Sequence, residues 1–143
     1  MAGSELKITG LDDLREALKS LPADLVHEAD GIVRGAASAA AAQIVSAYPT
    51  GPTGALKRGV SVETRSDAVS AVAIVRNRAR HAYIYERATK SPPRRWKKNG
   101  KSTGTMPAGN VFVPIAMEQR RRMLSSLIDL VERAGLKVTG SAT

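Results

Sequence analysis

A long alanine-rich stretch, from Ala23 to the Tyr48-Pro49 pair, constrains the fold of this 143-residue chain most. Its apolar residues recur at helical spacing, and Pro22 and Pro49 flank it, so it predicts one long helix that ends at Tyr48. The apolar stripe consists of Val26, Ala29, Val33, Ala36, Ala40, Ile44 and Ala47. Because most of these side chains are small, another element can approach the helix closely.

The opposite side of this helix also carries small residues, namely Gly31, Gly35, Ser38 and Ala42. A glycine inside a helix costs about 1 kcal/mol relative to alanine, so a freely solvated face does not favour it. Two interpretations are open: an exposed face without a role, or a second packing surface within the fold or between subunits. The second interpretation predicts a protein that works by assembling.

The remaining segments give strand and helix signals. Two runs rich in β-branched residues, 60–64 and 69–75, predict a hairpin that turns at residues 65–67. Shorter extended segments are expected around Leu6 and Ile8, at 82–85 and at 111–113. A short helix is expected before Pro22, and a final helix from Pro114 to about Ala134, with Gly135 as its stop. The prediction is one α+β domain, 1–143, whose small antiparallel β-sheet packs against the long helix and the C-terminal helix.

Positive charge is concentrated in the middle of the chain. The formal net charge is +9, and residues 68–117 hold ten Lys or Arg against one acid, Glu86. The rest of the chain is balanced, with 22 − 10 = 12 bases and 13 − 1 = 12 acids. Such a localised positive surface suits nucleic acid or an acidic protein face.

A basic extended loop is predicted at 87–110, where the sequence shows no periodicity. Stretches of this length without secondary structure are usually functional or disordered. A tryptophan between two basic pairs suits base stacking with phosphate contacts, or docking on an acidic protein; a solvated charge run is the alternative. The candidate residues, facing a partner or DNA, are Arg94, Arg95, Trp96, Lys97, Lys98 and Lys101.

The final helix places one arginine on its apolar side. The stripe consists of Met117, Leu124, Leu127, Ile128 and Val131. Arg120 points at its middle, and a charge on an apolar face is costly unless it is paired. We expect a buried ion pair with Glu86, or with a carboxylate of a neighbouring subunit.

The sequence offers no constellation for catalysis or metal binding. There is no cysteine, and His27 and His81 lack companions at zinc-ligand spacing. Gly100-Lys101-Ser102 is similar to the end of a phosphate loop, but Arg95 stands where that loop requires glycine. We expect no enzymatic activity, cofactor or small-molecule substrate. Neither a membrane span nor a signal peptide is evident, so a soluble, intracellular protein is expected.

Four short motifs resemble tailed-phage neck and tail-completion proteins, the head–tail connector family of lambdoid type. The lead "I-x-G-L-x-x-L" matches residues 8–14, and the turn "P-x-x-T-G-x-L-R" is similar to residues 49–57, with Lys57 in place of arginine. The strand "Y-A-x-Y-x-E-x-G-T" resembles residues 82–89, where Ala88 replaces glycine. The entry "P-F-L-R-P-A" to the last helix resembles residues 111–116.

This resemblance implies a structural subunit of an oligomeric ring, a hexamer rather than a dodecamer, between capsid portal and tail. It implies that DNA passes through the ring and that the ring contacts the duplex non-specifically. It also implies other phage neck and tail proteins as partners, the virion as the location after assembly in the host cytoplasm, and no enzymatic activity or cofactor. The alternative from the charge pattern alone is a sequence-independent nucleic-acid-binding domain.

Overall fold

A computed structural model describes residues 11–19, 22–67, 70–87 and 108–136 of the chain. The elements in order are α1 (Leu11–Lys19), α2 (Ala23–Ala47), α3 (Ala55–Arg58), β1 (Val60–Asp67), β2 (Ser70–Asn77), α4 (Ala82–Arg87) and α5 (Phe112–Arg133). The predicted α+β class is confirmed: a two-stranded antiparallel sheet packs with the long helix and the C-terminal helix.

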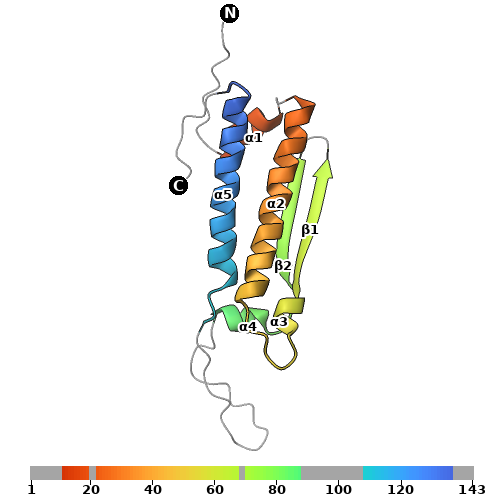
Figure 1. The fold of residues 1–143 in the computed structure, drawn as a ribbon, viewed down its shortest axis with the longest axis vertical. Coiled ribbons are helices and arrows are strands. Elements are labelled where there is room, and N and C mark those ends of the chain that lie inside the picture. The colour runs from red at the N-terminus through yellow and green to blue at the C-terminus, as the bar shows by residue number, and fades with distance from the viewer. Residues whose placement is uncertain (1–10, 20–21, 68–69, 88–107, 137–143) are drawn as a thin grey trace, which may run out of the picture.

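The long helix α2 is the centre of the fold (Figure 1). The hairpin β1–β2 packs along one side of α2, and α5 packs along another, so α2 is the element that contacts both the sheet and α5. The short helices α3 and α4 lie together at one end of this elongated arrangement, and α1 lies at the other end. The fold therefore has two distinct ends and a single central helix.

The ends of α2 follow from its flanking prolines, as expected. The carbonyl of Pro22 accepts hydrogen bonds from the amides of Leu25 and Val26, which starts the helix. Tyr48 takes an extended conformation before Pro49, with φ −68° and ψ 141°, and thereby ends it. The C-terminal helix α5 also ends where expected, because Gly135 follows it in a left-handed conformation, φ 85°.

The hairpin forms where the β-branched runs predict it, but its strands are longer. β1 pairs with β2 from Val60 opposite Asn77 to Asp67 opposite Ser70. The expected turn residues 65–67 therefore belong to β1. Their pairing with residues 70–72 shows that the two strands run almost to the tip.

Two clusters of buried side chains hold the layers together. At the α1 end, Leu130 and Val131 of α5 pack against α2 residues that include Leu25 and Ile32. At the opposite end, the core is formed by Ile44, Tyr48, Leu56 and Ala82. Ile44 of α2 and Leu130 of α5 are fully buried, and residues of α2 take part in both clusters.

Two expected strands are helical instead. Residues 82–85 lie in α4, because Ala82 and Tyr85, three residues apart, turn toward the core while Tyr83 and Ile84 stay exposed. Residues 111–113 form the entry to α5, which begins at Phe112. The extended segment expected around Leu6 and Ile8 lies outside the described residues.

Candidate assembly surfaces

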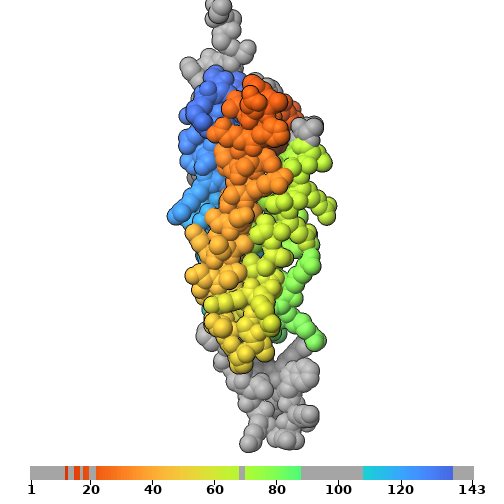
Figure 2. Space-filling view, turned by 45° about the vertical axis from the view of Figure 1, so that its right-hand side comes forward, coloured from red at the N-terminus to blue at the C-terminus, as the bar shows by residue number. Residues whose placement is uncertain are grey.

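The small-residue side of α2 is exposed. Gly31, Gly35, Ser38 and Ala42, hereafter the α2 face, are all open to solvent, and no described atom lies within 4 Å of a Cβ built on either glycine. Figure 2 shows α2 uncovered between α5 and the hairpin. Packing of this face within the fold, one of the two forms of the predicted packing surface, is thus not seen in the described part of the chain. Contact between subunits stays a prediction.

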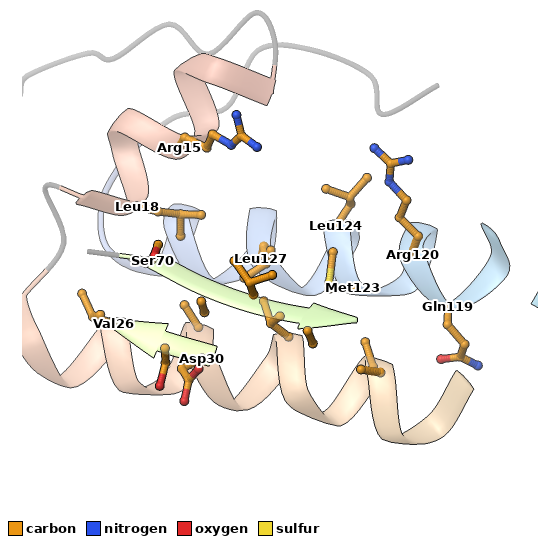
Figure 3. Close-up of a pocket in the computed structure, with 18 of the residues that line it drawn as sticks. Arg15, Leu18, Val26, Asp30, Ser70, Gln119, Arg120, Met123, Leu124 and Leu127 are labelled. Atoms are coloured by element: carbon orange, nitrogen blue, oxygen red, sulfur yellow. The ribbon is translucent and has the colours of Figure 1, made fainter. Parts of the chain in front are cut away.

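On the opposite side of α2 lies an apolar groove of about 740 Å³ (Figure 3). Its floor is the sequence-predicted stripe of α2, including Ala29, Val33, Ala36 and Ala40. At 100° per residue this set lies about half a turn from the α2 face. One wall is β2, the other is α5, and α1 covers one end through Leu18.

Two large apolar side chains of α5 stand exposed beside the groove. Val113 is 62% and Met117 46% exposed, and we call this pair the α5 ridge. Spacings of four, three and four place Val113, Met117, Arg120 and Leu124 along one side of α5. Because Arg120 and Leu124 line the groove, the α5 ridge belongs to the groove side of the molecule rather than to the α2 face.

The predicted ion pair between Arg120 and Glu86 is not formed. Arg120 is exposed on the rim of the groove, where it extends away from α2 (Figure 3), and it makes no ion pair with a described residue. The inward position next to it is Gln119, which is buried and donates a hydrogen bond to Gln43, Nε2 to Oε1, at 3.1 Å. The apolar stripe of α5 is centred about one position away from the predicted axis, so Arg120 reaches water. A pair with a carboxylate of a neighbouring subunit stays a prediction.

Glu86 instead joins three segments of the chain. Its carboxylate accepts hydrogen bonds from the Tyr48 hydroxyl at 2.8 Å and from the backbone amides of Val111, at 3.0 Å, and Phe112, at 3.1 Å. These amides open α5, whose N-cap residue makes no side-chain capping bond, so a carboxylate from α4 satisfies them and complements the helix dipole. We call these four residues the Glu86 clamp.

A backbone hydrogen bond joins the same two segments next to the clamp. The Gly109 amide donates to the Tyr85 carbonyl at 2.7 Å. A Cβ on Gly109 would overlap the Tyr85 ring, so the close approach requires glycine. Residues 85–87 and 108–112 are thereby held side by side. The chain between them, 88–107, makes up most of the predicted basic loop 87–110 and contains its six candidate contact residues, which lie outside the described residues; Arg87, the first residue of that loop, belongs to α4.

Burial governs the chemistry of Tyr48. Its side chain is 2% exposed, and its ring packs edge-on against Tyr85 with centroids 5.6 Å apart. This burial raises the pKa of Tyr48 to about 12, and the neighbouring Glu86 carboxylate acts in the same direction. Tyr48 therefore stays a neutral hydrogen-bond donor in the clamp at physiological pH.

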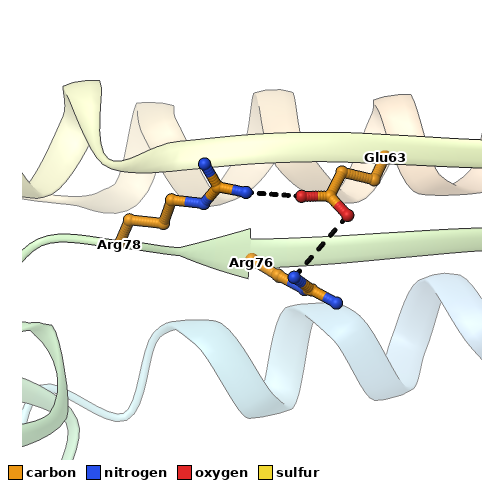
Figure 4. Close-up of polar contacts among 3 residues, drawn as sticks. All are labelled: Glu63, Arg76 and Arg78. Atoms are coloured by element: carbon orange, nitrogen blue, oxygen red, sulfur yellow. Dashed lines mark hydrogen bonds and ion pairs between the residues drawn. The ribbon is translucent and has the colours of Figure 1, made fainter.

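Several of the described basic residues make local contacts with acidic or aromatic side chains. Glu63 on β1 pairs with Arg78 at 2.6 Å and with Arg76 at 3.6 Å (Figure 4). Arg87 donates to the Tyr83 hydroxyl and stacks on its ring at 4.9 Å. Exposed pairs of this kind contribute about 0–1 kcal/mol each and describe a solvated surface rather than a binding site.

The described residues contain no cluster of acids and histidines that could hold a metal ion. Within the same ranges, no helix is long and apolar enough to cross a membrane. Comparison of the chain with protein-family models, curated proteins and solved structures gave no match.

Sequence reasoning found the α2 face but missed the groove and the Glu86 clamp. The groove depends on how far apart β2 and α5 stand, which no local pattern encodes. The clamp joins residues 38 and 25 positions apart. One sequence feature pointed to the clamp: Glu86 is the one acid in the basic segment 68–117.

Proposed function

We propose that this chain is a structural subunit of the head–tail connector of a tailed phage. Copies of it assemble into a ring, and double-stranded DNA passes through that ring. The observation that carries the proposal is the exposed, uncharged α2 face. Residues 35–47 include no ionisable side chain, yet several of them are exposed. The solvent side of a surface helix usually carries charge, so a face of this kind suits contact with another protein.

The geometry also supports a ring. A ring needs a contact between two different patches that lie on different sides of one subunit. The α2 face and the α5 ridge meet this requirement, since the ridge belongs to the groove side. In the proposed contact, Val113 and Met117 of one subunit pack on the small residues of the α2 face of the next.

The position of the basic segment supports passage of DNA. The Glu86 clamp holds the described residues that flank 88–107 at one end of the molecule, so each subunit of a ring contributes this positive segment from equivalent positions. Contacts with DNA in transit are electrostatic and independent of sequence. By the resemblance in its motifs, the proposal extends to a hexamer, to other neck and tail proteins as partners, and to a place in the virion.

Substitutions in the two patches test the proposal. Gly35→Arg on the α2 face and Met117→Lys on the α5 ridge should each convert the ring to monomers, because each buries an unpaired charge in the contact. Ser125→Arg, at an exposed position of α5, is the matched control and should leave the ring intact. The measurement is light scattering after size-exclusion chromatography, with circular dichroism to verify the fold.

Wild-type protein that stays monomeric, alone and with portal-side or tail-side proteins, would overturn the proposal. So would a ring that tolerates both Gly35→Arg and Met117→Lys. A ring that loses assembly only with Ser125→Arg would place the contact elsewhere.

A further inference from the structure

On the wall of the groove formed by β2, one row of backbone groups makes no hydrogen bond to another described residue. In Figure 4, β2 lies between β1 and α5, and both β2 and α5 line the groove, so the second edge of β2 faces α5 across it. The bond from the Arg78 amide to the Gly59 carbonyl, at 2.9 Å, fixes which residues of β2 bond to β1. Alternation then points the backbone groups of Ala71, Ala73 and Val75 away from β1.

These groups need hydrogen-bond partners. Ala71, Ala73 and Val75 all line the groove and are half-buried. None of them makes a backbone hydrogen bond outside the hairpin within the described residues. The partner that pairs a whole row of backbone amides and carbonyls along a strand edge is another strand.

The side chains of the groove are small and leave room for large apolar ones. The floor holds Ala29, Ala36 and Ala40, and the β2 wall adds Ala71 and Ala73. A strand that lies along β2 with its apolar side chains toward α2 would fill this space. The occupant must therefore alternate large apolar and polar residues.

We propose that the occupant is the chain's own N-terminal segment, residues 4–9, which pairs with β2 as a third strand. In this segment Leu6 and Ile8 alternate with Glu5, Lys7 and Thr9. Leu6 and Ile8 face α2, and the polar residues face outward.

The place where the segment enters favours this occupant over a partner chain. It directly precedes α1, and α1 already covers one end of the groove through Leu18 (Figure 3). Six extended residues span about 20 Å, which is within the length of the eight-residue β2. Because α1 lies at the end where β2 begins, a segment that ends at α1 runs antiparallel to β2. The inference is independent of the proposed function, and it leaves the α2 face and the α5 ridge available for assembly.

Hydrogen exchange in the intact chain tests the inference. The amides of Ala73 and Val75 should exchange at least tenfold more slowly than in the Leu6→Asp, Ile8→Asp double variant. The amide of Ile74 points toward β1 and is the internal control, so it should be protected in both proteins. Fast exchange of Ala73 and Val75 in the wild-type chain would overturn the inference, and that result does not depend on how well the variant folds.

Disulfide trapping identifies the source of the strand. The chain has no cysteine, so every disulfide bond in such a variant involves only the engineered thiols. Ile8→Cys with Ala73→Cys should oxidise within one chain at least tenfold faster than Lys7→Cys with Ala73→Cys, in which the first thiol faces outward. Equal rates would overturn the inference. Bonds between two chains would do so as well, since they would assign the strand to a neighbour. Both readouts are independent of oligomeric state.

Discussion

At the scale of single residues, Tyr48 and Glu86 determine how the end of the molecule is built. The carboxylate satisfies amides at the start of α5, and the hydroxyl of Tyr48 completes its hydrogen bonding. Removing one member leaves polar groups of the others in a half-buried site without a partner. The clamp should therefore be sensitive to substitutions that change almost no volume.

Tyr48→Phe is such a substitution. We expect it to lower the unfolding free energy by about 1–3 kcal/mol at pH 7, because the Glu86 carboxylate loses a donor. The measurement is urea unfolding followed by circular dichroism. A variant as stable as the wild type would show that the hydroxyl contributes nothing.

The same pair of proteins should differ in pH dependence. The pKa of Tyr48 is raised to about 12 in the folded state, and a tyrosine in an unfolded chain titrates near 10. Between these values only the unfolded state loses the proton, so wild-type stability should fall as pH rises above about 10, by up to about 1.4 kcal/mol per pH unit. Tyr48→Phe shares every other titrating group, and the difference between the two curves isolates this effect. Parallel curves would contradict it.

Gly109 offers a steric test of the same region. A methyl group there would overlap the Tyr85 ring, which is itself packed against Tyr48. Gly109→Ala should therefore destabilise the fold by about 1–3 kcal/mol. Gly31→Ala, where no described atom lies within 4 Å, is the control and should not destabilise it. Equal melting temperatures of the two variants would mean that the Tyr85 side chain moves aside without cost.

At the scale of elements, the sequence predicts what is periodic and misses what depends on distant partners. The limits of α2 follow from two prolines and a long stripe, and the hairpin follows from its β-branched runs. Residues 82–85 alternate small, aromatic and aliphatic side chains in a way that favours a strand. Only packing of Ala82 and Tyr85 against the core makes them helical. The candidate site divides in the same way, since the α2 face is periodic and the Glu86 clamp is not.

A prediction at this scale concerns the glycines of α2. With open space around Gly35, alanine should raise the unfolding free energy of the isolated subunit by about 0.5–1 kcal/mol through helix propensity. The comparison is made in a Met117→Lys background, which we expect to be monomeric, so that assembly does not contribute. A loss of stability would show that another part of the chain covers the α2 face.

At the scale of the whole molecule, the uncharged part of α2 and the excess of positive charge lie in different parts of the sequence. Residues 35–47 carry no ionisable side chain, whereas residues 68–117 hold the excess of positive charge. A molecule divided in this way can bind its own copies through one region and a polyanion through another. The two activities should be separable by mutation.

DNA binding tests this separation and distinguishes the connector from a dedicated nucleic-acid-binding protein. Monomers of Gly35→Arg should still bind duplexes, with dissociation constants of about 10⁻⁴–10⁻⁶ M that rise steeply with salt and do not depend on sequence. Replacing Lys97 and Lys98 by alanine should weaken binding to all duplexes about equally. Fluorescence anisotropy with several unrelated duplexes at two salt concentrations measures both effects. Nanomolar affinity for one sequence would favour the alternative function.

The Glu86 clamp has a consequence for how such a protein changes over generations. Because residues 85–87 and 109–112 are hydrogen-bonded to one another, the segment 88–107 connects two positions of the fold that lie close together. The entropy of closing a loop grows only with the logarithm of its length, so doubling the segment costs about 0.6 kcal/mol. We therefore expect insertions, deletions and substitutions in this segment to be tolerated. Its sequence can then change together with that of a binding partner, while the rest of the protein stays the same.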